Sequence, residues 1–422
     1  MILVFIGMFA LMILGLPIAY SIGLAAAFGL WNEAGLPLAV VPQRMFAMLH
    51  TFSLLAIPLF ILAGNLMDSG GISRRLIAFA SALIGHVRGG IAMVSILGCM
   101  LFGAISGSGA AASAAIGGIT IPSMKEKGYD KEFAGAIAAV SGPIGIIIPP
   151  SVVMIIYALT AGVSIGDLFL AGYLPGILLA TSLMLVVYIV ARKKGYPAGE
   201  KTSLRQKGRA LFQSFWALGM IFIIIGGIFG GFFTATEAAA VSVFYALIVG
   251  FFIYRDLKIS DLPRILKKSA MTSAAIMFCV AATNVLAWLM TIQQIPMRIG
   301  AVLGDVMGSV FIFLLFCNII FLILGTILDS TPAIILAVPI LLPIAQQFGV
   351  HPVHFGIITT VNLAIGMSTP PVGLTLFVSS GIAKTSLTSM VKPMLPLWIV
   401  MFVVLMLITY IPAISMFLVN LF

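Results

Sequence analysis

The sequence predicts an all-α polytopic membrane protein built from two inverted repeats, each with a re-entrant helical hairpin and a broken helix. The first observation is composition: 62% of the residues are hydrophobic and 8% are charged, whereas a soluble domain has about 25% charged residues. The second is that long apolar stretches recur along the whole chain without the alternation of a transmembrane barrel. The third is an internal repeat of a glycine–proline pattern.

The glycine–proline pattern reads SGPIGIIIPPS at 141–151 and NLAIGMSTPPV at 362–372. A shift of 221 positions, without a gap, superposes Gly145 on Gly366 and one proline pair on the other. Each copy breaks an apolar segment. One break alone is also explained by a kinked helix, but paired breaks in two halves of a chain indicate a transporter binding site near the bilayer midplane.

The N-terminal region is assigned from its apolar stretches and from nearby basic residues. Residues 1–30 are expected to form one span kinked at Gly15-Leu16-Pro17, and a helix follows over 51–68. The arginine-rich segment after that helix is placed in the cytoplasm, so that the N-terminus is cytoplasmic and residues 31–50 lie outside. No cleavable signal is expected, because no basic region precedes the first apolar stretch.

Residues 91–122 are expected to form the first hairpin, broken at Ser106-Gly107-Ser108-Gly109. Each arm has about 15 residues and spans roughly 22 Å, which is too short for a hydrocarbon core of roughly 30 Å. Charged residues flank both ends of the segment. The hairpin is therefore expected to enter and leave on the cytoplasmic side, with its tip inside the membrane and covered by protein.

The remaining elements repeat this arrangement. A broken helix over 133–160 crosses outward, and a second hairpin over 309–347 precedes a second broken helix over 354–383. Simple spans are expected at 169–190, 211–231, 236–254, 270–292 and 394–421. The segments 191–209 and 254–268 are basic and are placed in the cytoplasm. Because five crossings separate the hairpins, the second hairpin enters from the opposite side, so the repeats are inverted and the C-terminus is periplasmic.

The first hairpin tip offers ligands for a cation and for an anion. A helix that ends at a glycine-rich turn leaves carbonyls unpaired, and the next helix leaves N–H groups unpaired. Ser106 and Ser108 add hydroxyl oxygens, while Gly107 and Gly109 let a ligand approach the backbone. Oxygens of this kind suit a hard cation, and the N–H groups suit a carboxylate. Close packing of small residues is the alternative reading.

The two breaks and the second tip follow the same logic. Proline removes a donor and frees a carbonyl one turn back, which adds oxygens near Gly145 and Gly366. Asp329 is an ionisable group in an apolar stretch and is a default functional candidate. It could ligate a cation or cap the helix that follows. Ser330 and Thr331 are further candidate ligands or caps.

Several function classes are excluded by what the sequence lacks. It has no phosphate-binding loop of the Walker type and no histidine–carboxylate cluster, so neither ATP hydrolysis nor a metal enzyme is expected. The formal charge of +10 lies in short loops, which indicates topology rather than nucleic-acid binding. The three cysteines lie in apolar segments and are expected to be buried packing residues. An ion gradient is the simplest remaining energy source.

Five segments of the chain resemble the large membrane subunit of TRAP (tripartite ATP-independent periplasmic) transporters. They are SGSGAAASAAIGGITIPSMKEKGY, GPIGIIIPPSVVMIIY, GGFFTATEAAAVSVFY, LGTILDSTPAIILAVPILLPIA and GVHPVHFGIITTVNLAIGMSTPPVGLTLFV. The resemblance covers essentially the whole chain. It implies sodium-driven import of an organic acid, such as a C4-dicarboxylate, sialic acid or another sugar acid, across the bacterial inner membrane by an elevator motion.

The resemblance also implies partners and sodium ligands. A periplasmic substrate-binding protein is expected, and so is a separate small four-helix membrane subunit. One sodium site is expected from Ser106, Ser108 and the carbonyls near Gly145 and Pro149. The second is expected from Gly325, Gly366, Ser368 and Thr369. Substrate contacts are expected from Gly107, Gly109, Asp329, Ser330 and Thr331.

The elevator motion implies a moving transport domain and a fixed scaffold. The chain divides into scaffold helices at 1–88, a first repeat core at 89–168, scaffold and connecting helices at 169–292, a second repeat core at 293–392 and a C-terminal helix at 393–422. A carrier or exchanger that works without a binding protein remains an alternative. A membrane-embedded enzyme or assembly scaffold is a third class, against which the missing catalytic cluster argues.

Overall fold

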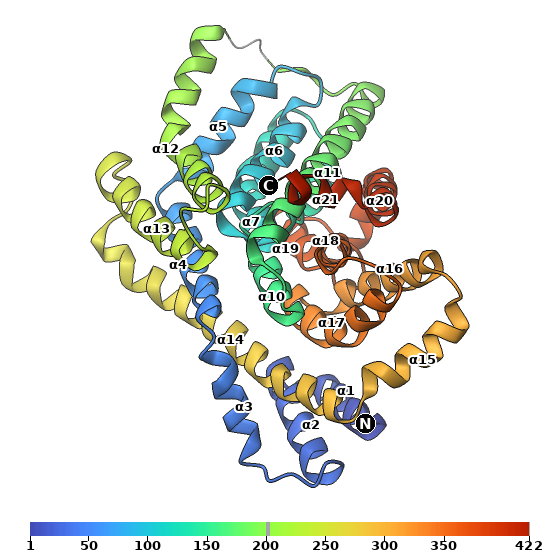
Figure 1. Cartoon of the computed structure of the whole chain (residues 1–422). Coiled ribbons are helices and arrows are strands. Elements are labelled where there is room, and N and C mark those ends of the chain that lie inside the picture. The colour runs from blue at the N-terminus through green and yellow to red at the C-terminus, as the bar shows by residue number, and fades with distance from the viewer. Residues whose placement is uncertain (200–202, 422) are drawn as a thin grey trace.

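The computed structural model describes residues 1–199 and 203–421, and the side chains of all of these except 301–306 (Figure 1). Residues 200–202 of the basic segment 191–209 lie outside the described residues. Within the described part every regular element is helical, apart from one isolated bridge between Arg88 and Ala198. Eight helices there are long and apolar enough to cross a membrane, or up to nine if a bent pair counts as one span. The chain is a multi-span helical membrane protein, as predicted.

The first thirty residues form two helices, so the prediction of one kinked span is wrong. α1 (Ile2–Ile13) and α2 (Ile18–Asn32) pack against each other. Gly15 has a φ of +88° and Pro17 precedes α2 as its cap, and this combination ends a helix rather than bending it. The N-terminal amine pairs with the Glu33 carboxylate. The N-terminus and residue 33 therefore lie at the same end, which contradicts the predicted placement on opposite sides.

The next helices lead from the N-terminal pair to the first hairpin. α3 (Val40–Leu49) precedes a 3-10 turn (Phe52–Leu55) and α4 (Ala56–Ser69), which matches the helix predicted at 51–68. α5 (Ile72–Ile84) then begins after Gly71, which has a φ of +72°. Neither α3 nor α5 was predicted.

The first hairpin and first broken helix are observed with slightly different limits. α6 (Gly90–Ser106) and α7 (Gly109–Glu126) pack against each other. With 17 and 18 residues the arms reach about 26 Å, so their length alone is weaker support for re-entrance than predicted. The broken helix consists of α8 (Lys131–Ser141), the single turn α9 (Ile144–Ile147) and α10 (Val152–Ala161), and the chain bends by 44° before α10.

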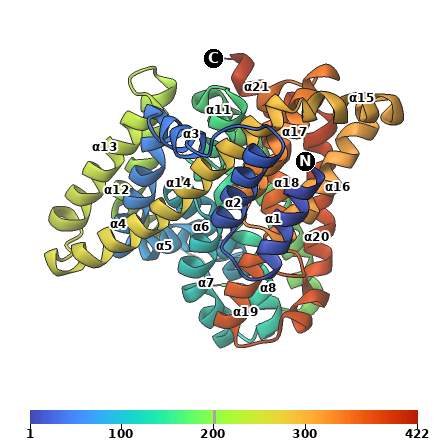
Figure 2. The ribbon, with the colours of Figure 1, turned by 90° about the horizontal axis from the view of Figure 1, so that it is seen from below.

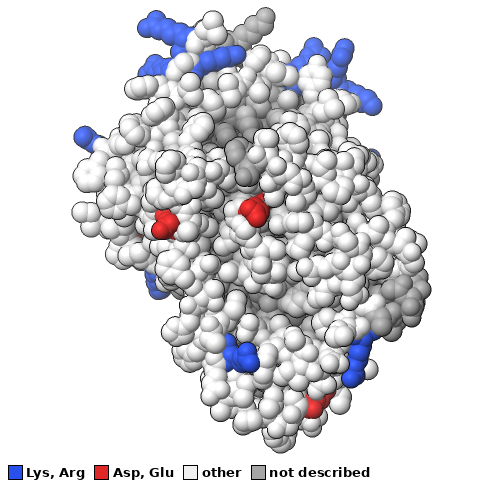
Figure 3. Space-filling model, viewed as in Figure 1, with Lys and Arg blue, Asp and Glu red and all other residues white. Residues whose placement is uncertain are grey.

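Four long helices separate the two hairpins after this broken helix. They are α11 (Ile165–Lys194), α12 (Leu204–Phe229), α13 (Ala235–Ile248) with a π-helical end η2 (Val249–Ile253), and α14 (Leu262–Ile292) after a short turn η3 (Ile259–Asp261). With the broken helix they correspond to the five predicted crossings. α14 begins eight residues earlier than the predicted span. In the view of Figure 3, Lys and Arg gather at the upper edge, over the ends of α11 and α12, and the middle of the face carries few charges.

The second half ends the chain. α15 (Ile295–Met307) leads to the second hairpin, α16 (Val310–Ile327) and α17 (Ser330–Gln347). The second broken helix consists of α18 (Pro352–Gly366) and α19 (Leu374–Ala383). The predicted last span at 394–421 is two helices, α20 (Leu387–Tyr410) and α21 (Ala413–Leu421), because Pro412 interrupts it.

The two halves repeat in structure as well as in sequence. The shift of 221 positions carries both ends of α7 onto the ends of α17, and it carries α6, α8 and α10 onto α16, α18 and α19 to within a few residues. The halves also exchange contacts: α10 of the first half packs on α17, and α19 of the second half packs on α7. Each hairpin is thus covered by the broken helix of the other half.

Candidate functional site

The two hairpin tips line one cavity of about 310 Å³. Ser106, Gly107, Ser108 and Gly109 come from the first tip, and Asp329, Ser330 and Thr331 come from the second. The two broken helices add apolar side chains, which are Ile146, Val152, Val153, Met367 and Leu374. Helices α4 and α14 supply another wall. All seven tip residues singled out from the sequence are therefore brought together.

The first tip is shaped by Gly107 and Ser108. Gly107 ends α6 in the left-handed region with a φ of +60°, a conformation that favours glycine. The Ser108 hydroxyl accepts a hydrogen bond from the N–H of Ala111 at 3.4 Å and caps α7. Ser106 is buried, and its hydroxyl accepts a long bond of 3.5 Å from the N–H of Ser108. Both hydroxyls keep lone pairs free for a ligand.

The first break lies directly behind this tip. Gly145 of α9 packs against Gly103 of α6 so closely that a Cβ on Gly103 would stand 2.1 Å from the Gly145 Cα. A Cβ on Gly145 would be 3.6 Å from the carbonyl oxygen of Ser108. The carbonyl of Pro149 accepts a hydrogen bond from the Tyr173 hydroxyl at 3.4 Å. Gly145 thus lies beside the serine tip, whereas the Pro149 oxygen already has a partner.

The second tip begins α17. The Asp329 carboxylate accepts a hydrogen bond from the N–H of Ser330 at 2.8 Å, so Asp329 caps this helix. The hydroxyl of Ser330 is buried and has no hydrogen-bond partner among the residues that the structure describes. An unsatisfied buried hydroxyl is costly, and here it borders the cavity. The cap reading of Asp329 is confirmed, while the carboxylate still faces the cavity.

The second break repeats the geometry of the first. A Cβ on Gly366 would stand 2.6 Å from backbone atoms of Gly325, so α16 and α18 touch through their backbones. The hydroxyls of Ser368 and Thr369 donate to the carbonyl of Ile365 at 2.9 and 2.8 Å. These four predicted residues lie together, but none of them lines the cavity between the tips.

The polar residues of the facing wall were not predicted from the sequence. Asn65 and Asp68 of α4 and Lys268 and Thr272 of α14 also line the cavity. The Asn65 amide donates to the Ser269 hydroxyl at 2.9 Å and links the two helices. Lys268 was assigned to a cytoplasmic loop because it ends the basic segment 254–268. Since α14 begins at Leu262, it lies in the helix instead.

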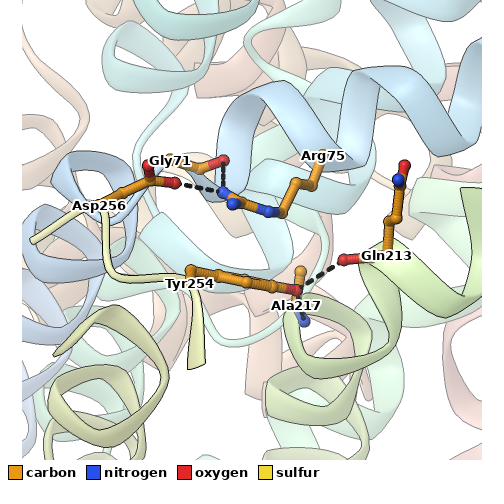
Figure 4. Close-up of polar contacts among 6 residues, drawn as sticks. All are labelled: Gly71, Arg75, Gln213, Ala217, Tyr254 and Asp256. Carbon is orange, nitrogen blue, oxygen red and sulfur yellow. Dashed lines mark hydrogen bonds and ion pairs between the residues drawn. The ribbon is translucent and has the colours of Figure 1, made fainter. Parts of the chain in front are cut away.

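A second polar cluster ties α5 to α12 and to the end of η2 (Figure 4). Arg75 forms an ion pair with Asp256 at 2.6 Å, and its guanidinium lies 3.7 Å from the ring centroid of Tyr254. The Tyr254 hydroxyl donates to the carbonyl of Gln213 at 2.9 Å and accepts from the N–H of Ala217 at 3.1 Å. This cluster fixes the helix that leads into the first hairpin.

A third cluster lies at the turn between α7 and α8. Asp130 accepts hydrogen bonds from Lys194 at 2.6 Å and from the Tyr196 hydroxyl at 2.8 Å. These bonds lower the pKa of Asp130, since they favour its charged form. Burial is the main cause that raises the pKa of Tyr129 to about 12. The cluster joins the end of the first hairpin to the end of α11.

Comparison with known proteins identifies the family. The model of the tripartite ATP-independent periplasmic transporter, DctM component, matches residues 5–414. This chain belongs to that family. The family consists of transporter permeases, which agrees with the expectation that the chain is not an enzyme.

Curated relatives and one solved structure match over nearly the full length. The C4-dicarboxylate TRAP transporter large permease of Rhodobacter capsulatus is 40% identical, over 98% of this chain and 97% of the relative. The sialic acid TRAP transporter large permease of Vibrio cholerae is 38% identical, over 99% and 97%. The YdaH transporter of Alcanivorax borkumensis has a TM-score of 0.64 at 14% identity, over 90% and 89% of the two chains. This last likeness shows a shared fold.

Proposed function

We propose that this TRAP permease carries an anionic organic solute, a C4-dicarboxylate or sialic acid or another sugar acid, across the bacterial inner membrane together with sodium. The observation that carries the proposal is the single cavity where both hairpin tips and both broken helices meet, opposite α4 and α14. Relatives of almost equal identity are named for C4-dicarboxylates and for sialic acid. Identity therefore favours an organic acid without choosing between these two.

The position of the tips supports the proposal that both hairpins are re-entrant and that they enter the membrane from opposite sides. In Figure 2 the α7–α8 region lies at the lower edge, whereas α15, which leads into the second hairpin, lies at the upper edge. Hairpins that crossed the whole membrane would have tips at opposite surfaces, but these tips line one cavity. With the basic segments in the cytoplasm, residues 31–50 are periplasmic, and the N-terminus beside Glu33 is periplasmic too. The C-terminus is also periplasmic.

Sodium is proposed as a co-transported substrate that binds near two close contacts between glycine residues. At Gly103–Gly145 and at Gly325–Gly366 the backbones touch where a Cβ would clash, and serine or threonine residues follow within a few residues of each contact along the chain. Ser106, Ser108 and carbonyls near Gly145 and Pro149 would hold one ion. Gly325, Gly366, Ser368 and Thr369 would hold the other. The carbonyl and hydroxyl oxygens of these residues are ligands that a hard cation prefers.

Substrate binding is proposed at the tips themselves. Gly107, Gly109, Ser330 and Thr331 lie around the N-terminal ends of α7 and α17, where N–H groups and the helix dipole favour a carboxylate. Asp329 borders the same position as the cap of α17 and would contact the substrate away from its carboxylate. The partnerless hydroxyl of Ser330 is available to the same ligand. When sodium binds the nearby oxygens, the tips would be held in place and could move as a unit with the bound acid.

An elevator motion is proposed from the packing. α11 packs on α6, α18 and α20, so we group α6–α11 with α16–α21 as the moving part, and α1–α4 with α12–α14 as the scaffold. α5 and α15 connect the two groups. This grouping moves α11 out of the scaffold segment that the sequence suggested, and it adds the C-terminal helices to the moving part. A separate small four-helix subunit would brace the scaffold, and a periplasmic binding protein would deliver the acid.

The test is reconstitution of the chain with its small subunit in liposomes. Uptake of radiolabelled succinate and sialic acid would be measured with and without an inward sodium gradient, and with and without the matching binding protein. Uptake that needs both would support the proposal and name the acid. Sodium-driven uptake without a binding protein would make the chain a stand-alone carrier. Absence of uptake of any organic acid would contradict the proposal.

A further inference from the structure

Lys268 is the cation of the cavity wall. Among the described residues that line the cavity, the charged side chains are Asp68, Lys268 and Asp329. Lys268 is exposed and forms no ion pair with any described carboxylate. Asp68 accepts a hydrogen bond from the Ser73 hydroxyl at 2.7 Å. The formal charge of the lining is therefore −1, although the proposed substrate is an anion.

An ammonium that pairs with no described carboxylate, in a cavity that two carboxylates also line, has a clear electrostatic effect. A carboxylate that enters the cavity meets repulsion from Asp68 and Asp329, and Lys268 offers the compensating charge. Charge-assisted hydrogen bonds between an ammonium and a carboxylate are stronger than neutral ones. The ammonium also has three donors and a long flexible stem, so it can follow a ligand within the cavity.

Lys268 belongs to the fixed side of the cavity. It lies in the second turn of α14, next to Ser269, which is held to α4 by the bond from Asn65. The hairpin tips lie on the other side. In the proposed motion the tips move relative to α14, so a contact from Lys268 exists in one position of the tips and is lost in the other.

We propose that Lys268 is a scaffold contact for the substrate carboxylate that sets affinity on the cytoplasmic side. The sidedness rests on the basic segment 254–268, which leads into α14 and is cytoplasmic by its charge. The inference rests on the proposed function, because it assumes that the cavity receives an organic anion. Lys268 holds the acid after the tips have moved inward, and Asp68 opposes it.

The test measures affinity on each side separately. Liposomes hold unlabelled succinate inside, and the binding protein with labelled succinate outside selects the molecules of one orientation. The lumenal concentration that gives half-maximal exchange then reports the cytoplasmic side. Lys268→Gln should raise this concentration about tenfold, the loss expected for one charge-assisted hydrogen bond. The external concentration for half-maximal uptake should change less than twofold. Lys268→Arg should keep most of the lumenal affinity that Lys268→Gln loses. Asp68→Asn should raise the lumenal affinity above that of the wild type.

Lys267→Gln is the matched control, since Lys267 is exposed and does not line the cavity. Equal behaviour of the two glutamine variants, or an equal change on both sides of the membrane, would overturn the inference. Thermal unfolding of the purified complex with succinate or sialic acid gives a readout that needs no transport. Stabilisation by an acid that disappears in Lys268→Gln, without uptake by the wild type, would reject the transport proposal alone. If neither acid stabilises the wild-type protein, the Lys268 contact is rejected.

Discussion

Gly64 of α4 lies directly against Ser106 at the tip of the first hairpin: a Cβ on Gly64 would stand 3.0 Å from the Cα of Ser106. α4, which we place in the proposed scaffold, therefore touches the tip at a position where α4 has no side chain. A smooth contact of this kind suits the sliding that the proposed elevator motion requires, because side chains that interlock would resist the movement.

Gly64→Ala should slow transport without preventing folding. The added methyl group overpacks the contact at a cost of about 1–3 kcal/mol, which lowers the rate about 5-fold to 150-fold if it opposes movement. Uptake and the amount of folded protein are measured together. Gly118→Ala is the control, because nothing lies within 4 Å of a Cβ there. Equal uptake by the two variants would show that the contact does not limit movement.

Removal of a hydroxyl from either proposed sodium site should weaken sodium activation. Ser106→Ala and Thr369→Ala each delete one oxygen, and the sodium concentration for half-maximal uptake should rise about tenfold. Expression should stay within about twofold, since Ser106→Ala removes only a hydroxyl and Thr369→Ala removes a hydroxyl and one methyl group. If neither variant changes the sodium dependence of uptake, the assignment of both sites is wrong.

Asp329 is expected to act mainly as a helix cap. Asp329→Asn should retain thermal stability and most of the uptake, because asparagine caps a helix about as well as aspartate. Asp329→Ala should lose about 1 kcal/mol, because the bond to the N–H of Ser330 disappears. Thermal unfolding and uptake of both variants decide the question. Loss of sodium-dependent uptake in Asp329→Asn, at normal stability, would instead assign the carboxylate to ion binding.

Asp130 should stabilise the fold at neutral pH and lose this effect in acid. Its pKa is lowered in the folded state by the bonds from Lys194 and Tyr196, so the stabilisation is full above the ordinary aspartate pKa of about 4 and is lost as the pH falls through the lower folded value. Asp130→Asn should lower the unfolding temperature by a constant amount between about pH 5 and pH 8, and this difference should shrink in stronger acid.

Glu126→Gln is the control for Asp130→Asn, since Glu126 is exposed and forms no ion pair among the described residues. High salt should reduce the effect of Asp130→Asn, because the cluster is largely exposed. A difference between wild type and Asp130→Asn that persists unchanged to strongly acidic pH would contradict the electrostatic explanation.

Much of the fold could be predicted because it depends on apolar length and on glycine and proline. The hairpins, the broken helices and the five intervening crossings are fixed by long apolar runs that Ser106-Gly107 and the proline pairs interrupt. The short helices α3, α5, α15 and α21 were missed, because they are too short to stand out from neighbouring apolar residues. The reversal after Gly15 was missed because one glycine and one proline also describe a kink.

The part of the candidate site at the helix ends was predicted, because local backbone chemistry defines it. The part on the facing helices was missed, because it depends on tertiary packing. The seven tip residues meet in the cavity because each tip is a helix end with small polar residues. Asn65, Asp68 and Lys268 come from simple helices with no local signal. Their position depends on how α4 and α14 cross the tips, and the residue pattern within one helix does not predict that crossing.

The packing of each hairpin against the broken helix of the other half has a consequence for biosynthesis. α7 leaves the ribosome long before α19, which packs on it. At about 5–20 residues per second the delay is on the order of ten seconds or more. During that time the first hairpin packs only on helices of the first half, and the face of α7 that α19 covers stays open. The nascent protein therefore needs the insertion machinery, a chaperone or the small subunit to shelter this face until the second half arrives.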